Sequence, residues 1–338
     1  MTEKQYGGST GRGTGNKSTK SKQPELKPKI IKEKKKEKPK EKSDTKKDKI
    51  LLAGKTAAEV KKYARTIIKK GVPLLEIAEK IENKMSELGV KPSFPTNLSI
   101  NEVAAHYTPS YDDKNLAHGL IKVDLGTHVD GWISDTAFSL DLENSEENKK
   151  LIQVSEEALE NAIKIIKPEK TVSEIGKIIQ NTIESKGFSV IINLSGHSID
   201  KYELHSGLTI PNFDNKQDFL IGEGIRAIEP FVTNGNGKVR DGKPSGIYML
   251  ENTKNVRSPI ARETLNYIQE EYQTMPFCSR WLVKKFGVKA LFGLKQLEQN
   301  GNLHQFAQLI ESCKGIVAQT EQTLLIEKDK TIVTTKED

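Results

Sequence analysis

The stretch DLGTHVDGWISD at residues 124–135 places two aspartates on either side of a β-turn signal. Asp130-Gly131 is a preferred centre for the two-residue turn of a β-hairpin, and apolar runs flank the stretch on both sides. With this pair at the centre of the turn, Asp124 faces Ala137, and Asp135 is the diagonal neighbour of Asp124. Both carboxylates then point to one face of the sheet, with Cβ atoms about 7 Å apart. The stretch therefore predicts a hairpin that supplies half of a metal site.

Two like charges on one sheet face repel each other, and burying either is costly unless a positive group neutralises it. The alternative is a solvated hairpin with two unrelated surface aspartates. Two further carboxylates favour the metal site. Glu229 ends the apolar face of a strand predicted at residues 224–230, and Glu321 lies inside a strand predicted within the β-rich stretch 315–335. An uncompensated charge is unexpected at such positions, and a cation would explain both.

Charge is unevenly distributed along the 338 residues, whose formal net charge is +7. Residues 1–50 hold 17 Lys and Arg against 7 Asp and Glu, out of 53 and 46 in the whole chain, so the remainder is slightly acidic. The basic pI therefore says nothing about a nucleic-acid surface on the folded part. The low apolar content of residues 1–50 predicts a disordered tail. It is either a solubilising leader or an electrostatic tether to RNA, such as the ribosome.

Cysteine usage and hydropathy indicate the compartment. Cys278 and Cys313 are too few and too isolated for a disulfide framework or a thiolate metal site, which suggests a reducing environment. The N-terminus has no signal-peptide core, and no apolar run approaches membrane-spanning length. We expect a cytoplasmic protein without membrane association, and a monomer.

Apolar spacing predicts the following elements. A capping box at Thr56–Glu59 starts the first helix, and further helices run from Pro73 to Gly89, over residues 145–166 and over residues 171–186. Strands are predicted within residues 92–110 and at 188–194. Residues 261–299 look helical in pieces and contain no cluster of candidate ligands, so they are interpreted as an inserted helical subdomain.

The candidate ligands are Asp124, Asp135, His197, Glu229 and Glu321. Oxygen and nitrogen donors without thiolate suit Mn, Fe, Co or Zn rather than a structural Cys-zinc site. Four carboxylates are too many for one ion but nearly balance two divalent cations. Two metal ions bridged by carboxylates can hold a hydroxide at neutral pH and polarise a carbonyl, which is the chemistry of metal-assisted hydrolysis.

Five sequence blocks resemble the methionine aminopeptidases of type II. They are AAHYTP, VDLGTHVDGWISDTAF, SGHSIDKYELHSG, AIEPFVTNGNGKV and AQTEQT, in this order between about residues 55 and 335. The resemblance implies an α+β pita-bread (creatinase/aminopeptidase-like) fold. It divides the chain into a disordered Lys-rich tail (1–50), a catalytic domain (51–244 and 305–338) and a helical insertion (245–304), and this insertion favours type II over type I.

The resemblance also implies roles for the candidate ligands. Asp124 would chelate one ion through both oxygens, Asp135 and Glu321 would bridge the pair, and His197 and Glu229 would hold the second ion. Two divalent metal ions per chain are expected.

Further roles concern the reaction. Glu229 would also shuttle a proton, and His106 and His205 would line the substrate pocket and contact the scissile peptide. Considered alone, a histidine such as His106 is more often a structural hydrogen bonder. The implied reaction removes the initiator methionine from nascent polypeptides whose second residue is small.

The chain departs from the family pattern at two places. Gln322 follows the last metal glutamate, where the family commonly has histidine, and Phe306-Ala307 stands where a Tyr-Pro pair is common. Neither change removes a metal ligand. Two alternatives share the fold: an Xaa-Pro dipeptidase relative, and a non-catalytic pita-bread protein that binds ribosomes or RNA. The retention of all five ligands favours the enzyme.

Overall fold

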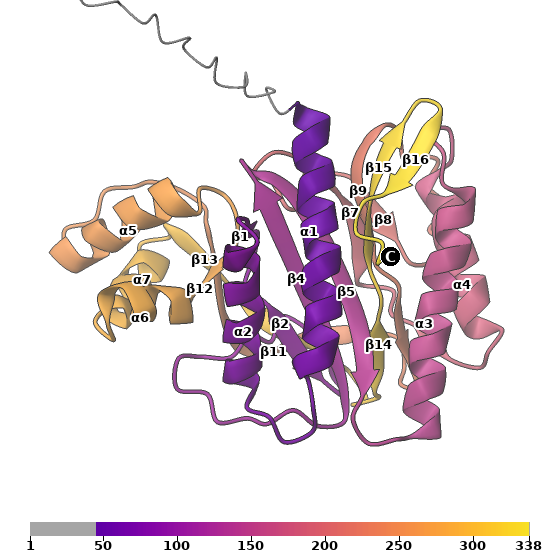
Figure 1. Ribbon diagram of the computed structural model, residues 1–338, viewed down its shortest axis with the longest axis horizontal. Helices are drawn as coiled ribbons and strands as arrows, with labels where there is room; N and C mark the ends of the chain where they lie inside the picture. The colour runs from indigo at the N-terminus through magenta and orange to yellow at the C-terminus, as the bar shows by residue number, and fades with distance from the viewer. Residues whose placement is uncertain (1–44, 338) are drawn as a thin grey trace, which may run out of the picture. The chain divides into compact units, whose positions relative to one another are not determined.

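The computed structural model describes residues 45–337. The first half packs two helices onto a β-hairpin, because the apolar stripes of both helices share one core with the hairpin strands (Figure 1). The elements are α1 (Lys46–Ile67), α2 (Leu74–Glu87), β1 (Lys91–Pro92), β2 (Asn97–Ile100), β4 (Leu120–Val129) and β5 (Trp132–Asp141). Strand β4 pairs with β1, β2 and β5. The helix predicted from Pro73 is confirmed, since Pro73 caps α2.

The hairpin of β4 and β5 has the predicted register. Asp124 pairs with Ala137, and Asp135 pairs with Gly126, so the two aspartates are diagonal neighbours. Asp130 and Gly131 have φ values of +50° and +83°. Positive φ at both central residues is what a two-residue type I′ turn requires. The turn dipeptide thus sets which residues share a sheet face.

The predicted start of the first helix at Thr56 is wrong, because α1 begins at Lys46. An earlier capping box caps the helix: Thr45 Oγ1 accepts from the N–H of Asp48, whose carboxylate accepts from the N–H of Thr45. The earlier start buries Ile50, which is 1% exposed, and leaves Thr56 inside the helix. Residues 46–50 are therefore helical rather than disordered, and the other residues of the predicted tail, 1–44, lie outside the described residues.

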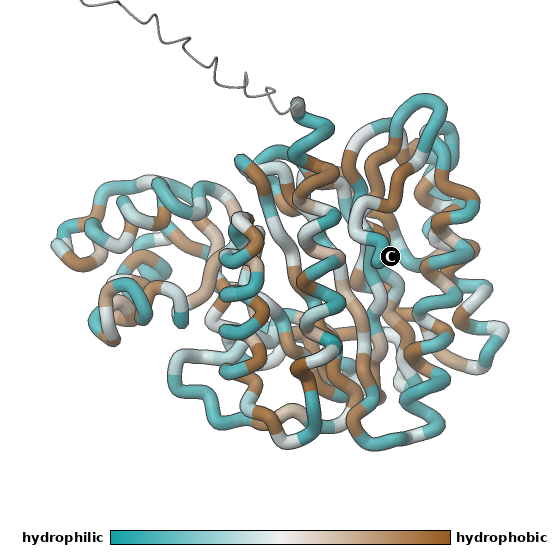
Figure 2. The backbone as a smooth tube through the Cα atoms, in the orientation of Figure 1, coloured by the Kyte–Doolittle hydropathy of each residue, from teal (hydrophilic) through white to brown (hydrophobic). Residues whose placement is uncertain are grey.

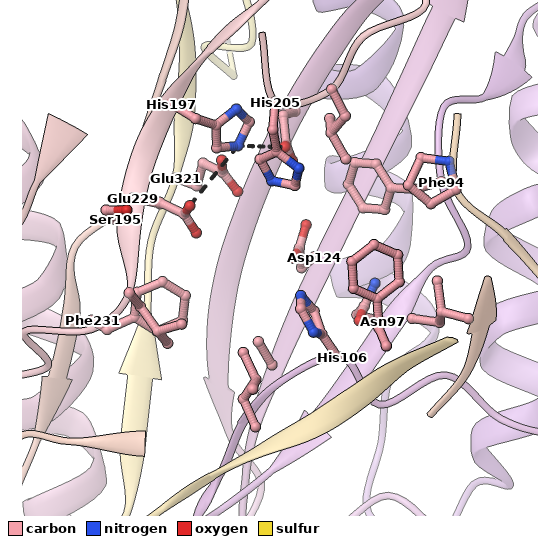
Figure 3. Close-up of a pocket in the computed structure, with 18 of the residues that line it drawn as sticks. Phe94, Asn97, His106, Asp124, Ser195, His197, His205, Glu229, Phe231 and Glu321 are labelled. Atoms are coloured by element: carbon pink, nitrogen blue, oxygen red, sulfur yellow. Dashed lines mark ion pairs between the residues drawn. The ribbon is translucent and has the colours of Figure 1, made fainter. Parts of the chain in front are cut away.

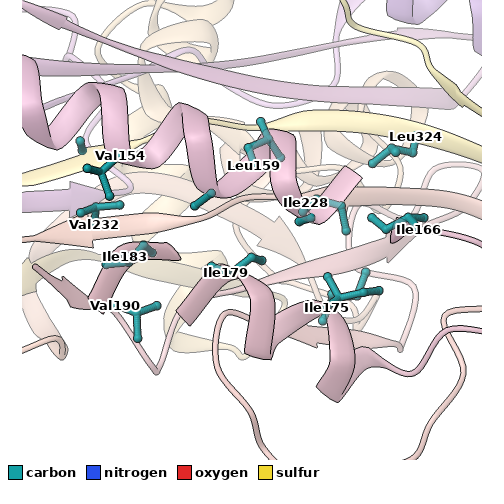
Figure 4. Packing of buried hydrophobic residues seen from close by; sticks show 14 of the residues in the cluster. Val154, Leu159, Ile166, Ile175, Ile179, Ile183, Val190, Ile228, Val232 and Leu324 are labelled. Carbon is teal, nitrogen blue, oxygen red and sulfur yellow. The ribbon is translucent and has the colours of Figure 1, made fainter. Parts of the chain in front are cut away.

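The second half repeats the arrangement with another helix pair. Helices α3 (Glu146–Ile165) and α4 (Val172–Glu184) begin where they were predicted, directly after Ser145 and Thr171, whose side chains cap them. Their apolar faces pack on strands of a second sheet, as Figure 4 shows. That sheet has the order β16 (Lys330–Val333), β15 (Gln322–Glu327), β9 (Gly224–Ile228), β7 (Ser195–Ile199) and β8 (Thr209–Pro211). In Figure 2 the helices turn hydrophobic residues toward the strands and hydrophilic residues outward.

The strand predicted at residues 188–194 is shorter than expected. Only β6 (Ser189–Val190) forms, and it pairs with β10 (Phe231–Thr233), which also pairs with β14 (Val317–Gln319). Beyond β6, the side-chain amide of Asn193 donates to Val239 O at 2.7 Å and accepts from Val239 N at 2.9 Å. These two side-chain hydrogen bonds take the place of backbone pairing between strands at this point.

Another sheet is connected to the helices that were predicted within residues 261–299. Its order is β12 (Phe277–Cys278), β11 (Val239–Leu250), β13 (Leu303–Glu311) and β3 (Val103–Ala105). Between β11 and β13 lie α5 (Pro259–Glu271), α6 (Ser279–Phe286) and α7 (Ala290–Gln299), which share a hydrophobic core of their own. No helix of the described residues has the length and apolarity to cross a membrane.

Candidate active site

Three candidate carboxylates are neighbours across strands. Asp124 on β4 pairs with Ala137 on β5, and Ala137 forms an isolated bridge with Glu321. Glu321 N donates to Ala137 O at 3.0 Å. Asp135 lies two residues before Ala137 on the same strand, so its side chain points to the same face. The backbone pairing alone therefore brings the three carboxylates together.

Glu321 lies between two strands, whereas it was predicted inside one. Strand β14 ends at Gln319 and pairs with β10, and β15 begins at Gln322 and pairs with β9. Pro230 separates β9 from β10, so the chain changes partners at this point. The backbone of Glu321 then bonds to β5 instead, which is why its carboxylate reaches the aspartates.

His197 and Glu229 approach from the second sheet. His197 on β7 pairs with Ala227 on β9, and Glu229 directly follows β9. His197 Nε2 lies 3.5 Å from Asp135 Oδ2 and 3.9 Å from Glu229 Oε1. Figure 3 shows the side chains of His197 and Glu229 pointing into one pocket, together with Asp124. One ligand atom each from Asp135, His197 and Glu321 lies within 4.8 Å of the others.

The carboxylates of this cluster are buried, and three of them have an oxygen without a hydrogen-bond partner. Asp135 and Glu321 are 5% and 1% exposed. One buried oxygen of each of Asp124, Asp135 and Glu321 has no hydrogen-bond partner among the described residues. Burial raises the pKa of Asp135 to about 7. Burial and the neighbouring negative charges raise the pKa of Asp124, Glu229 and Glu321 well above the usual range. Oxygen and nitrogen donors with partnerless buried oxygens fit divalent metal ions.

The two other predicted histidines lie in the same pocket. The rings of His205 and His197 are 4.3 Å apart, and burial, followed by the charge of His197, lowers the pKa of His205 to about 3. His106 has φ of +62°, and its Nδ1 lies 3.2 Å from Ala307 O. Burial lowers its pKa to about 4, so its imidazole is neutral at neutral pH. Its ring meets Phe306 edge to face at 5.5 Å.

All seven predicted site residues line a single pocket of about 390 Å³. The sequence interpretation named Phe306 as a departure from the family pattern but missed the rest of the apolar wall, whose residues come from five separate segments. This wall includes Phe94, Phe231, Ile247, Pro276 and Phe306. These residues carry no chemical signal, because an aromatic or aliphatic side chain in a strand is usually core.

Gln319 was also missed. It donates to Glu229 Oε2 at 3.4 Å, and its side chain counteracts the rise in the pKa of Asp124. A signal for it existed, because it precedes Glu321 by two residues in the same block.

Gln322 faces away from the pocket, which explains why this departure from the family pattern is compatible with the site. In the amide orientation that satisfies both ends, Nε2 donates to Thr335 O at 2.9 Å and Oε1 accepts from Lys61 Nζ at 3.2 Å. Lys61, whose side chain is 2% exposed, also donates to Thr136 Oγ1 at 3.0 Å. Thr136 Oγ1 in turn donates to Glu321 O at 2.8 Å. Gln322 thus belongs to a hydrogen-bond network that lies outside the pocket and holds the backbone of Glu321.

Comparisons with known proteins bear on the family of this chain. The model of metallopeptidase family M24 matches residues 48–265. A methionine aminopeptidase of Pyrococcus abyssi is 44% identical over 294 residues, which cover 86% of this chain and 99% of the relative. This chain belongs to metallopeptidase family M24. A methionine aminopeptidase of Pyrococcus horikoshii is similar to this family member at 45% identity, with the same shares covered.

Solved structures confirm the pita-bread fold of this M24 metallopeptidase. A thermophilic Arx1 matches with a TM-score of 0.73 at 18% identity, covering 85% of this chain and 89% of that one. A methionine aminopeptidase of Thermotoga maritima matches with a TM-score of 0.62 at 24% identity, covering 86% and 96%. At such identities the likeness concerns the fold alone. Membership of family M24 implies the use of divalent metal, for which the buried cluster is the candidate site.

Proposed function

We infer that this chain is a methionine aminopeptidase, which hydrolyses the peptide bond after an N-terminal methionine. The observation that carries the inference is the pocket, in which a cluster of buried carboxylates and histidines adjoins an apolar wall. Relatives at 44% and 45% identity, matched over 99% of their length, bear this name. These relatives favour neither an Xaa-Pro dipeptidase nor a non-catalytic binding protein.

The proposed ligands are Asp124, Asp135, His197, Glu229 and Glu321, and they would hold two divalent ions of Mn, Fe, Co or Zn. The support is the set of partnerless buried oxygens and the charge balance of four carboxylates. Such ions supply a hydroxide at neutral pH and polarise the scissile carbonyl. By the family resemblance, Asp135 and Glu321 would be shared by both ions, and one ligand atom of each lies within 4.8 Å of the other.

The chain's own residues position the substrate and move the proton. Glu229, held by Gln319 at 3.4 Å, carries a proton from the attacking water to the leaving amine. His106 and His205 contact the scissile peptide, because both line the pocket and a neutral imidazole can donate and accept a hydrogen bond. The apolar wall around Phe94, Phe231 and Phe306 accepts the methionine side chain, since it offers no polar group for a charged one.

Cleavage of a tripeptide panel tests this function. Purified protein is expected to cleave Met-Ala-Ser and Met-Thr-Ser about 10- to 100-fold better than Met-Leu-Ser and Met-Arg-Ser, because a closed pocket excludes bulk beyond the methionine. The measurement is kcat/KM for release of free methionine. Equal values across the four peptides would instead indicate a broader aminopeptidase.

The proposal also covers the natural substrates and the compartment of the reaction. A preference for small second residues would make nascent polypeptides the substrates, with removal of the initiator methionine as the result. Both Cys278 and Cys313 are free, as expected in the reducing cytoplasm.

The basic segment offers a contact to the ribosome or its RNA. Residues 1–44 hold 14 Lys and Arg against 6 Asp and Glu, so they can neutralise phosphates. Deletion of residues 1–44, which keeps the Thr45 cap of α1, is expected to leave tripeptide hydrolysis intact and to weaken salt-sensitive association with ribosomes. Co-sedimentation from about 50 to about 200 mM salt measures this association.

A full-length variant with glutamine in place of the lysines at residues 32–42 separates charge from length. Like the deletion, it is expected to keep tripeptide hydrolysis and to bind ribosomes more weakly. Ribosome binding that is the same in all three proteins would leave the segment as a solubility leader.

A further inference from the structure

We propose that Glu82 and Arg280 form a clamp outside the pocket that holds the substrate wall in place, and that this clamp sharpens discrimination at the second residue of the substrate. The consequence for specificity rests on the proposed function. Neither residue lines the pocket, so both act as positioning residues.

The pair joins the helical insertion to the first half of the fold. Glu82 lies on α2 and Arg280 on α6, and the two residues are 198 positions apart in the chain (Figure 1). Arg280 Nη1 lies 2.6 Å from Glu82 Oε2, and Nη2 lies 2.9 Å from Oε1. The side chains are only 4% and 10% exposed. Trp281 Nε1 donates to the same carboxylate at 2.8 Å. Two parallel hydrogen bonds between a guanidinium and a carboxylate fix the orientation of both groups, so this buried pair has one defined geometry.

The clamp holds the first wall segment through the backbone. The N–H of Thr96 donates to Glu82 Oε1 at 3.3 Å. Thr96 stands between Pro95 and Asn97, and both of these line the pocket. A shift of the Glu82 carboxylate therefore moves this wall.

Arg280 holds the second wall segment, which contains His106. Its Nε donates to Pro109 O at 3.1 Å, and its Nη2 donates to Thr108 Oγ1 at 3.3 Å. Thr108 Oγ1 also donates to Thr96 O at 2.8 Å, so the two segments are tied together. His106 has a positive φ of +62°, an unfavourable conformation for a side chain with a Cβ. Such a conformation persists only where the surrounding structure enforces it, and Arg280 fixes the residues that follow.

The third wall segment belongs to the insertion itself. Pro276 lines the pocket and stands four residues before Arg280 in the chain. One ion pair thus connects three walls that come from three parts of the sequence. If these walls lost their register, the pocket would widen, and the site proposed above would reject a bulky second residue less sharply.

The test uses a double variant, because removal of one partner alone would leave a buried charge unpaired and could unfold the protein. Replacement of both, Glu82→Leu with Arg280→Met, leaves neither charge buried without its partner and removes the bonds to residues 96, 108, 109 and 281. The variant is expected to keep the metal content of the parent. Its preference for Met-Ala-Ser over Met-Leu-Ser, expressed as a ratio of kcat/KM values, is expected to fall about tenfold. A loss of folded protein would lower both rates equally and leave the ratio unchanged.

Two further variants sharpen the test. Arg280→Lys keeps the charge but loses the two parallel hydrogen bonds. Its substrate ratio is expected to lie between those of the parent and the double variant. Glu271→Gln removes an exposed ion pair with Lys91, 2.7 Å long, which also joins the insertion to the first half. It is expected to keep the parent ratio.

Hydrogen exchange gives a readout that does not depend on activity. Amides of residues 96–109 are expected to exchange faster in the double variant and at the parent rate in Glu271→Gln. An unchanged substrate ratio together with unchanged exchange, in a folded double variant, would overturn the clamp. A parent protein that does not release methionine would instead refute the proposed function, and the exchange rates would still decide the clamp.

Discussion

Replacement of Glu321 by alanine is expected to lower the rate of methionine release more than about 100-fold, beyond the loss usually caused by changing an outer-shell partner of a metal. The reason is the position of its carboxylate, which is 1% exposed, shares the central cluster with Asp135 and His197, and has one oxygen without a partner. Asp135→Ala is expected to have the same effect. Metal analysis of each purified variant measures bound ions directly, alongside the kinetics.

The matched control for this prediction is Glu327→Ala. Glu327 is the last residue of β15, the strand that begins directly after Glu321, but its carboxylate is exposed and pairs with Lys47 at 2.6 Å. It is expected to keep both full metal content and full activity. Normal hydrolysis by Glu321→Ala or Asp135→Ala would refute the assignment of these residues as bridging ligands.

Removal of metal is expected to lower the melting temperature by about 8–16 °C. Four carboxylates whose pKa values are raised by burial face one another in this pocket, and a bound cation relieves their repulsion. Binding to the folded state alone adds about 4 kcal/mol when free metal is about 1,000 times its dissociation constant. For a domain of this size each kcal/mol shifts the melting temperature by about 2–4 °C. Thermal unfolding of chelator-stripped and reloaded protein measures the shift.

Glu321→Ala again provides the control. Because it lacks a central ligand, its melting temperature is expected to respond little to added metal, whereas Glu327→Ala is expected to respond like the parent. Identical melting curves for stripped and reloaded parent protein would argue against a buried metal site.

Local chemistry in the sequence was enough to predict the hairpin and several helices. The Asp130-Gly131 turn sets the register, and with it the shared face of Asp124 and Asp135. The caps at Ser145 and Thr171 set the starts of α3 and α4. Each of these features is decided by residues that are close in the chain.

Other features depend on distant contacts and could not be predicted. Two capping boxes compete for the start of α1, and the burial of Ile50 by tertiary packing decides for the earlier one. Glu321 leaves its strand because Pro230 interrupts the partner strand more than 80 residues away. The pairing of Glu82 with Arg280 joins residues 198 positions apart. No periodicity or motif in one segment reports such pairings.

The most direct test of the account is reconstitution of the metal-free protein with Mn, Fe, Co or Zn, each assayed on Met-Ala-Ser, Met-Leu-Ser and Ala-Pro-Ser. The account predicts that the stripped protein is inactive, that at least one of these ions restores release of methionine, and that Met-Ala-Ser is the preferred substrate. Hydrolysis without metal, or a preference for Ala-Pro-Ser after reloading, would contradict it.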